Sequence, residues 1–113
     1  MPKRDVKLYL DDILDSACAI QEFVSDMDFE TFCNDRKTFS ATIRECIIIG
    51  EAVSHVIELL EEENPNYPWR MIKDFRNFII HEYFGVDSKI IWDLTQLELE
   101  ALITAVKSLE TKN

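Results

Sequence analysis

Glycine and proline are scarce in this chain, which has two glycines and three prolines among its 113 residues. No segment alternates apolar and polar residues as a half-buried β-strand does. These absences exclude a strand-rich fold, so the sequence predicts an all-α protein. The length suits one domain with a single core and is too short to divide in two, so one domain over residues 1–113 is expected.

Long hydrophobic runs are also absent, because the longest candidate, CIIIG, falls far short of the roughly 18 residues that a membrane span needs. The basic start MPKRDVKLYLDD turns acidic at once, unlike a signal peptide. The three cysteines show no C-x-x-C spacing, which favours reduced thiols over a disulfide framework. We therefore expect a cytoplasmic protein that makes no use of a membrane.

Basic residues are outnumbered, with 12 Lys and Arg against 22 Asp and Glu and a net charge of -10. This balance excludes nucleic-acid binding by overall attraction, so any RNA contact must be local. The acidic surface could instead meet a basic face on a protein partner. Only His55 and His81 are present, and no spacing of His, Cys or carboxylate residues indicates a closed metal site, so no metal or other cofactor is expected.

The chain does have apolar residues at helical spacing along most of its length. Helices are predicted over residues 6–27, 39–60, 69–84 and 90–109, with at most a short helical turn within 26–35. Gly85 should close the third helix, and Asp87 or Ser88 should cap the last. The prediction is an up-down bundle of four to five helices, mostly antiparallel. Gly50 lies in the apolar face of the second predicted helix. It is either a tolerated defect or, as we favour, a point where another backbone approaches closely.

The third predicted helix carries the chemically interesting side chains. With Arg76 at zero and about 100° per residue, an arc from about 200° to 320° is apolar and is the expected core face: Met71, Ile72, Phe75, Phe78 and Ile79. The remaining arc holds the polar groups together with Trp69 and Ile80: Arg70, Lys73, Asp74, Arg76, Asn77, His81 and Tyr83. Arg76 and His81 diverge by about 140°, so one straight helix does not aim both at one point. Asn77 and His81, at i and i+4, can act together.

Each of these groups also has an ordinary structural interpretation. Arg70, Lys73 and Arg76 against Asp74 form either a small phosphate-binding patch or a solvated face. His81 alone could be a surface or capping histidine, and Tyr83 a half-buried aromatic. Glu51 could reach over and orient a basic residue of the third helix, or could be only a surface charge. His55, one turn later, has no evident partner in the sequence.

The segment RNFIIHEY, residues 76–83, resembles the Arg-x4-His-x-Tyr signature of the HEPN superfamily, in particular the small HepT-like toxins of prokaryotic toxin–antitoxin pairs. Three further segments are similar to that family in the same order: IIIGEAV, PWRMIKDFRN and HEYFGVD followed by IIW. The resemblance covers residues 8–109 approximately. It implies an all-α bundle that forms a homodimer, in which two motif helices build one composite cleft, and a metal-independent ribonuclease activity.

The resemblance further implies roles for single residues. Arg76 and His81 would be catalytic with Asn77 in support, and Arg70 and Lys73 would contact RNA. The protein would be the toxin of a type VII toxin–antitoxin system, an endoribonuclease acting on tRNA or mRNA. Its partner, an MntA-type nucleotidyltransferase antitoxin, would neutralise it by transferring AMP to Tyr83. The alternative left open is a non-catalytic helical dimerisation and binding partner of a nucleotidyltransferase.

Overall fold

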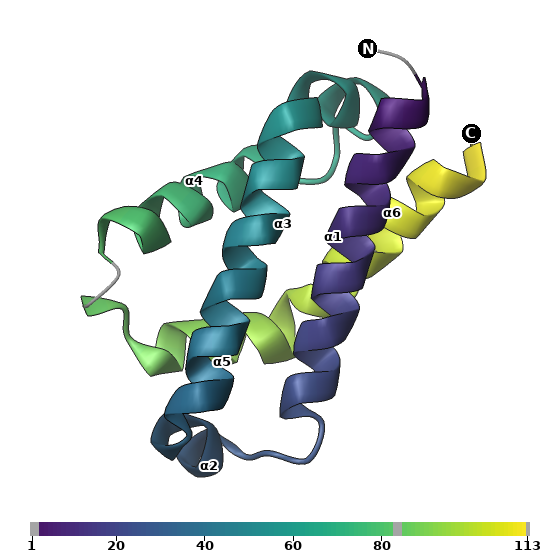
Figure 1. Cartoon of the computed structure of the whole chain (residues 1–113). Helices are drawn as coiled ribbons and strands as arrows, with labels where there is room; N and C mark the ends of the chain where they lie inside the picture. Colours follow the sequence, from purple (N-terminus) through teal and green to yellow (C-terminus); the bar gives the residue numbers. More distant parts are fainter. Residues whose placement is uncertain (1–2, 83–84, 113) are drawn as a thin grey trace.

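The computed structural model describes residues 3–82 and 85–112, and every regular element in these ranges is a helix. The all-α prediction is therefore confirmed. Six helices follow one another along the chain: α1 Lys3–Val24, α2 Phe29–Asn34, α3 Arg36–Glu63, α4 Trp69–His81, α5 Ser88–Leu97 and α6 Leu99–Lys112. The long helices α1 and α3 lie side by side in opposite directions, α4 packs on the outer side of α3, and α5 and α6 cross behind them (Figure 1).

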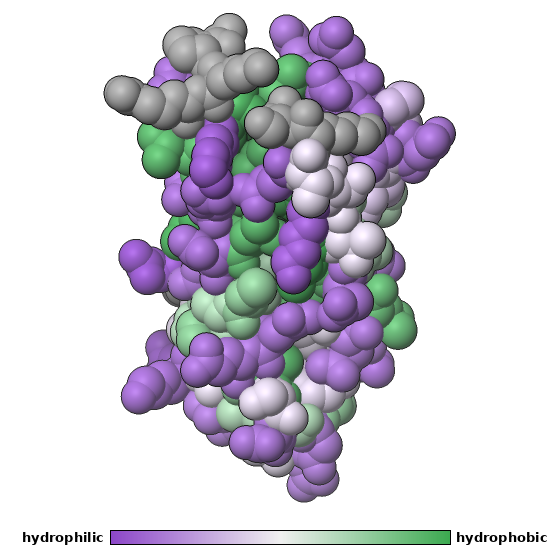
Figure 2. Space-filling model, turned by 90° about the vertical axis from the view of Figure 1, so that its right-hand side faces the viewer, coloured by the Kyte–Doolittle hydropathy of each residue, from purple (hydrophilic) through white to green (hydrophobic). Residues whose placement is uncertain are grey.

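The core is formed mainly by α1, α3 and α6. All members of the predicted α1 stripe except Met27 are buried: Val6, Leu10, Ile13, Ala17, Ile20 and Val24. Such burial of a whole helix face is the main favourable contribution to the stability of a domain of this size. The opposite side of the molecule from α4, where α1 and α6 lie, is covered mostly by hydrophilic side chains (Figure 2).

The predicted turn between the first two long helices is the short helix α2, held by aspartates at both ends. The Asp28 side chain accepts a hydrogen bond from Thr31 N at 2.8 Å. Asp35 ends α2 and also caps α3, accepting from Thr38 N at 3.1 Å. These carboxylates satisfy backbone donors that the helices leave open. The start of α3 is thereby fixed, which sets the register of the long helix that carries Gly50.

The predicted last helix is two helices, which corrects the expected single element over 90–109. Asp87 caps α5 by accepting from Lys89 N at 2.9 Å, in agreement with one of the two predicted caps. Glu98 then ends α5 with φ -112° and ψ -25°, and α6 begins at Leu99. The buried positions Ile91, Thr95 and Leu99 continue at steps of four through this break. The apolar spacing therefore gave no sign of it.

The face by which α4 packs differs from the predicted core face. Trp69, expected on the polar side, is 1% exposed, whereas Met71, expected in the core, is 67% exposed. The packed stripe runs through Trp69, Arg76 and Ile79, about 120° around the helix from the centre of the arc of Met71, Phe75 and Phe78. The reason is that α4 packs mainly on α3 along this stripe and leaves Met71 and Phe75 of the apolar arc facing α5.

The end of α4 also comes earlier than predicted. The helix ends at His81, and the Glu82 backbone N–H caps it by donating to Phe78 O at 2.9 Å. Phe84, the predicted last residue, lies outside the described residues. His81 is thus the final residue of the helix. Among the helices within residues 3–82 and 85–112, none has the combination of length and apolar character that crossing a membrane requires.

Candidate active site

The helix that carries the motif packs tightly against α3 at Gly50. A β-carbon placed on Gly50 would overlap the β-carbon of Arg76 and lie 2.5 Å from its Cγ. The lack of a side chain at Gly50 is therefore what allows α4 to pack at this depth. The close approach favoured from the sequence is confirmed, and the partner is the first residue of the motif.

The guanidinium of Arg76 is held by two side chains of α3. Arg76 Nη1 donates to Glu51 Oε1 at 2.7 Å, and Nη2 donates to Ser54 Oγ at 3.3 Å. Arg76 Nε is buried and has no hydrogen-bond partner among the described residues. Glu51 therefore does orient a basic residue of the motif helix, one of its two interpretations from the sequence. The contact with Ser54 was not predicted from the sequence, although Ser54 follows Gly50 by four residues and so lies on the same helix face.

Asn77 and His81 lie away from this contact. Both side chains are exposed, and within residues 3–82 and 85–112 neither makes a side-chain hydrogen bond. Because α4 is a regular helix up to His81, Arg76 and His81 are separated by about 7.5 Å along its axis and about 140° around it. One copy of the chain thus presents Arg76 toward α3 and His81 to solvent. Tyr83 lies outside the described residues.

The positive patch predicted on α4 is balanced by carboxylates in the fold. Arg70 forms an ion pair with Glu61 of α3, with Nε to Oε2 at 3.0 Å and Nη2 to Oε1 at 3.3 Å. Arg76 is paired with Glu51, and Asp74 lies on the same helix. Lys73 is half-buried. Arg70 and Arg76 are thus each paired with a carboxylate of α3, so the local positive excess expected from α4 alone is largely offset in one copy of the chain.

His55 has a partner that the sequence did not reveal. Its ring stacks on Tyr9 of α1, with ring centroids 4.9 Å apart and planes inclined by 14°. Stacking of this kind is typical of packed aromatic pairs. The two residues lie on different helices and far apart in the chain, so no local spacing could indicate the contact. The stack ties α1 to α3 one turn beyond Glu51.

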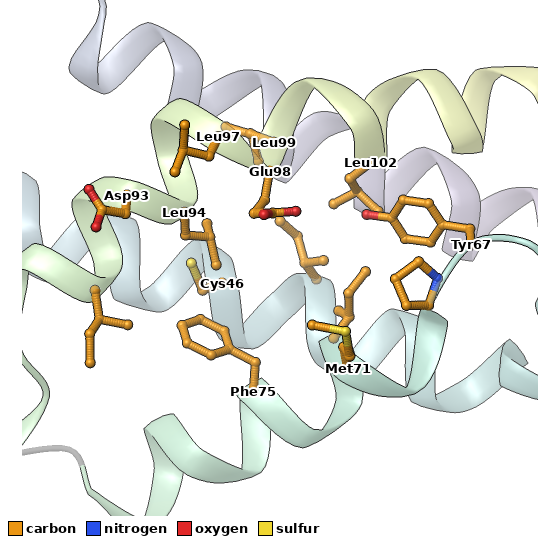
Figure 3. Close-up of a pocket in the computed structure, with 14 residues that line it drawn as sticks. Cys46, Tyr67, Met71, Phe75, Asp93, Leu94, Leu97, Glu98, Leu99 and Leu102 are labelled. Carbon is orange, nitrogen blue, oxygen red and sulfur yellow. The ribbon is translucent and has the colours of Figure 1, made fainter.

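An open groove of about 340 Å³ lies between α4 and the α5–α6 segment (Figure 3). Its walls are mostly apolar and include Met71 and Phe75 of α4 and Leu94 and Leu97 of α5. Figure 3 shows Tyr67, just before the start of α4, at one end of the groove. Glu98 lies on the side that α5 and α6 form. Burial, and next the charge of Glu98, raise the pKa of Tyr67 to about 12. The groove is thus an apolar surface beside the motif helix with carboxylates along one edge.

Cys46 of α3 lies in this groove and is buried. Burial, and next the charge of Glu45, raise the pKa of its thiol to about 12, so the sulfur stays protonated and unreactive at neutral pH. Within the described part of the chain, no three His, Cys, Asp or Glu side chains are grouped so that they could hold a metal ion.

Comparison with known proteins identifies the family of the chain. The family model described as Ribonuclease HepT-like matches residues 13–109. A Methanocaldococcus jannaschii protein named "Putative RNase" is 43% identical over 83% of this chain and 78% of its own length. A second from that organism, also named "Putative RNase", is 42% identical over 85% of this chain and 88% of its own.

A Thermococcus cleftensis protein named "Probable ribonuclease HepT" is 38% identical over 88% of this chain and 91% of its own length. No match was found among solved structures. The family model spans most of the chain, and the relatives are 38–43% identical to it, which together establish its family. The chain belongs to the Ribonuclease HepT-like family.

Proposed function

We propose that this protein is a metal-independent endoribonuclease whose reaction is carried by Arg76 and His81. The observation that carries the proposal is the fixed guanidinium of Arg76, held from α3 at 2.7 Å by Glu51, on the same helix as the exposed His81. The names of the relatives, which include "Probable ribonuclease HepT", support the same reaction class. A fixed cation and an imidazole are the groups that phosphodiester cleavage in RNA needs.

In the proposed reaction, His81 takes the proton of a ribose 2'-hydroxyl, whose oxygen then attacks the adjacent phosphorus. The bond to the 5'-oxygen breaks, that oxygen takes up a proton, and a 2',3'-cyclic phosphate remains. Arg76 stabilises the charge that develops on the phosphate oxygens. Asn77, one turn before His81, positions the imidazole or the phosphate. Arg70 and Lys73 would contact the RNA backbone outside the reacting bond.

The proposed active form is a homodimer with one composite cleft. Support comes from the divergence of Arg76 and His81 on α4, since a second copy can supply the group that one helix directs elsewhere. Support also comes from exposed apolar surface. Among the described residues, eight large hydrophobic side chains are exposed, and α4 and α5 carry five of them: Met71, Phe78, Ile80, Ile90 and Leu97. Met71, Ile90 and Leu97 of this set line the groove of Figure 3, which is where we propose that the second copy packs.

We further propose that the protein is the toxin of a toxin–antitoxin pair and that an MntA-type nucleotidyltransferase silences it by adding AMP to Tyr83. The basis is the match of the motif tyrosine. Negative charge and bulk two residues after His81 would compete with an RNA phosphate for the same groups. Mass spectrometry of the protein co-expressed with such an enzyme should show a gain of AMP that Tyr83→Phe abolishes. No gain with the wild-type protein would contradict this regulation.

The ribonuclease proposal is tested with purified protein and RNA in EDTA. Wild type should cleave RNA to products with cyclic phosphate ends, Arg76→Ala and His81→Ala should not, and an all-deoxy substrate should stay intact. Arg36→Ala, which removes an exposed arginine from the start of α3, is the matched control and should cleave normally. Loss of cleavage in His55→Ala but not in His81→Ala would show that the wrong histidine has been assigned.

The second candidate function is a binding partner of a nucleotidyltransferase with no catalysis of its own. It is favoured by the pairing of Arg70 and Arg76 with carboxylates of α3, which leaves little positive charge for RNA in a chain of net charge -10. The same assay distinguishes the two functions. If wild type and His81→Ala leave the same trace of cleavage, the binding role is the better description.

A further inference from the structure

The contact between Glu51 and Arg76 is unusual for a charge pair at a helix surface. The pair is short, at 2.7 Å, but unevenly exposed: 19% of the Arg76 side chain is accessible and 48% of the Glu51 side chain. The stem of Arg76 is already fixed where it packs on Gly50. Holding the guanidinium therefore costs little further side-chain entropy, which is the cost that weakens most exposed ion pairs.

The negative charge of Glu51 argues against a role for this residue in attracting RNA. Glu51 is negative and sits on the group that is to meet an RNA phosphate, so electrostatically it opposes RNA binding. Ser54 holds the second terminal nitrogen of the same guanidinium without adding charge. The two hydrogen bonds together fix the plane of the forked guanidinium group. An arginine has five N–H donors, so donors remain for a phosphate after these two bonds.

We infer that Glu51, assisted by Ser54, is a positioning residue for the ribonuclease reaction: it fixes the orientation of the Arg76 guanidinium and does not itself touch the substrate. This inference rests on the proposed function for its catalytic meaning. A fixed fork stabilises charge on the reacting phosphate without having to reorganise during the reaction, which is the source of rate in such sites. A free arginine at the same place would bind phosphate in many orientations.

The kinetic test compares Glu51→Ala, Glu51→Gln and Ser54→Ala in the RNA cleavage assay. Glu51→Ala should lower kcat about tenfold while KM stays equal or falls, because orientation is lost and an opposing charge is removed. Glu51→Gln keeps an oxygen that accepts from Nη1 and should recover most of kcat. Ser54→Ala should lower kcat by a smaller factor. Glu58→Ala removes an exposed glutamate further along α3 and should behave as wild type.

Two kinetic results would overturn the inference. If Glu51→Ala keeps the wild-type kcat, Glu51 does not position Arg76 for the reaction. If Glu51→Gln loses as much kcat as Glu51→Ala, the charge of the carboxylate matters and its hydrogen-bond geometry does not. Thermal unfolding of each variant, followed by circular dichroism, shows whether a lower kcat comes from a loss of fold.

An NMR experiment tests the positioning without any activity. The Nε–H signal of Arg76, assigned by its absence in Arg76→Lys, should exchange slowly with solvent in the wild type, because this nitrogen is buried and its side chain is held. In Glu51→Ala the signal should broaden or exchange faster. If the wild type cleaves no RNA, the proposed function fails while this measurement still decides the positioning. An unchanged Arg76 signal in Glu51→Ala would overturn the inference whatever the activity.

Discussion

Gly50 of α3 and Arg76 of α4 pack so closely that no side chain fits between them. This contact determines two things at once. It sets the depth at which the motif helix lies on the core, and it places the guanidinium of Arg76 within reach of Glu51, the residue that follows Gly50. The geometry of the candidate site is therefore built into the packing of two helices, and a change at the contact should affect stability and activity together.

Gly50→Ala is the first prediction. The added methyl group would overlap the stem of Arg76, so α4 must move outward, at a cost of about 1–3 kcal/mol in the free energy of unfolding. Urea denaturation measures this loss, and RNA cleavage should fall as well because Arg76 is displaced. Gly85→Ala is the control: there the nearest atom, Glu82 Oε2, is 3.9 Å from the added carbon. Equal stability of the two variants would contradict the packing argument.

Two neighbouring isoleucines of α4 give the second prediction. Ile79 is fully buried and Ile80 is 45% exposed. Ile79→Ala should lower the free energy of unfolding by about 2–5 kcal/mol, since it removes buried apolar atoms and leaves a cavity. Ile80→Ala should change it by less than about 0.5 kcal/mol. Urea denaturation of both variants is the measurement, and a reversed order would mean that α4 packs by a different face.

Part of this fold could be predicted from the sequence, because burial of α1 and α3 follows directly from their apolar spacing. The packed face of α4 could not. Periodicity identifies which side of a helix is apolar, but not which neighbour covers that side. In α4 the neighbour α3 takes the stripe of Trp69 and Arg76, and the more apolar arc around Met71 is left facing the groove.

The candidate site divides in the same way. The motif itself, the special role of Gly50 and the reach of Glu51 toward the third helix were available from the sequence. The pairing of Arg70 with Glu61 was not, because an ion pair between two helices depends on their relative placement. That pairing changes the electrostatics of the site, since it offsets part of the positive excess that α4 would have in isolation.

Met71→Glu tests the proposed packing of two copies through the groove. The side chain is 67% exposed in one copy, so a charge there should not unfold the chain. It should prevent association, because a carboxylate would be buried against apolar side chains of the partner. Sedimentation equilibrium should show a dimer for wild type and a monomer for the variant. Leu8→Glu, at a 57% exposed position on α1, is the control and should remain a dimer.

Alkylation of the cysteines provides a test of the packed core. Cys18 and Cys33 are exposed, whereas burial raises the pKa of Cys46 to about 12. At pH 8 only about one Cys46 thiol in ten thousand would be ionised, and the thiolate is the reactive form. Iodoacetamide should therefore add two groups to the folded protein and three in denaturant, as counted by mass spectrometry. Rapid addition of a third group to the folded protein would contradict the burial of Cys46.

The last prediction concerns two carboxyl groups that join α1 to α6. A hydrogen bond between Glu110 and Asp11 raises the pKa of Glu110 and lowers that of Asp11, with burial and the charge of Asp11 adding to the first effect. The nearest cation, Lys7, holds its Nζ 3.8 Å from Glu110 Oε2, which is too far for a hydrogen bond. Glu110 is thus the carboxyl group that keeps the proton as the pH rises.

A pKa that is raised in the folded state means that folding is favoured while Glu110 is protonated, and that this contribution is lost as the pH rises through the raised pKa. Glu110→Gln keeps an N–H donor for Asp11 and removes the charge, so its midpoint temperature should exceed that of wild type at pH 7. The gain should vanish near about pH 4, where glutamate is largely protonated in both states. Glu62→Gln, which removes an exposed charge from α3, controls for the smaller net charge. An equal gain in Glu62→Gln, or a gain that persists at pH 4, would show that the carboxyl pair is not its cause.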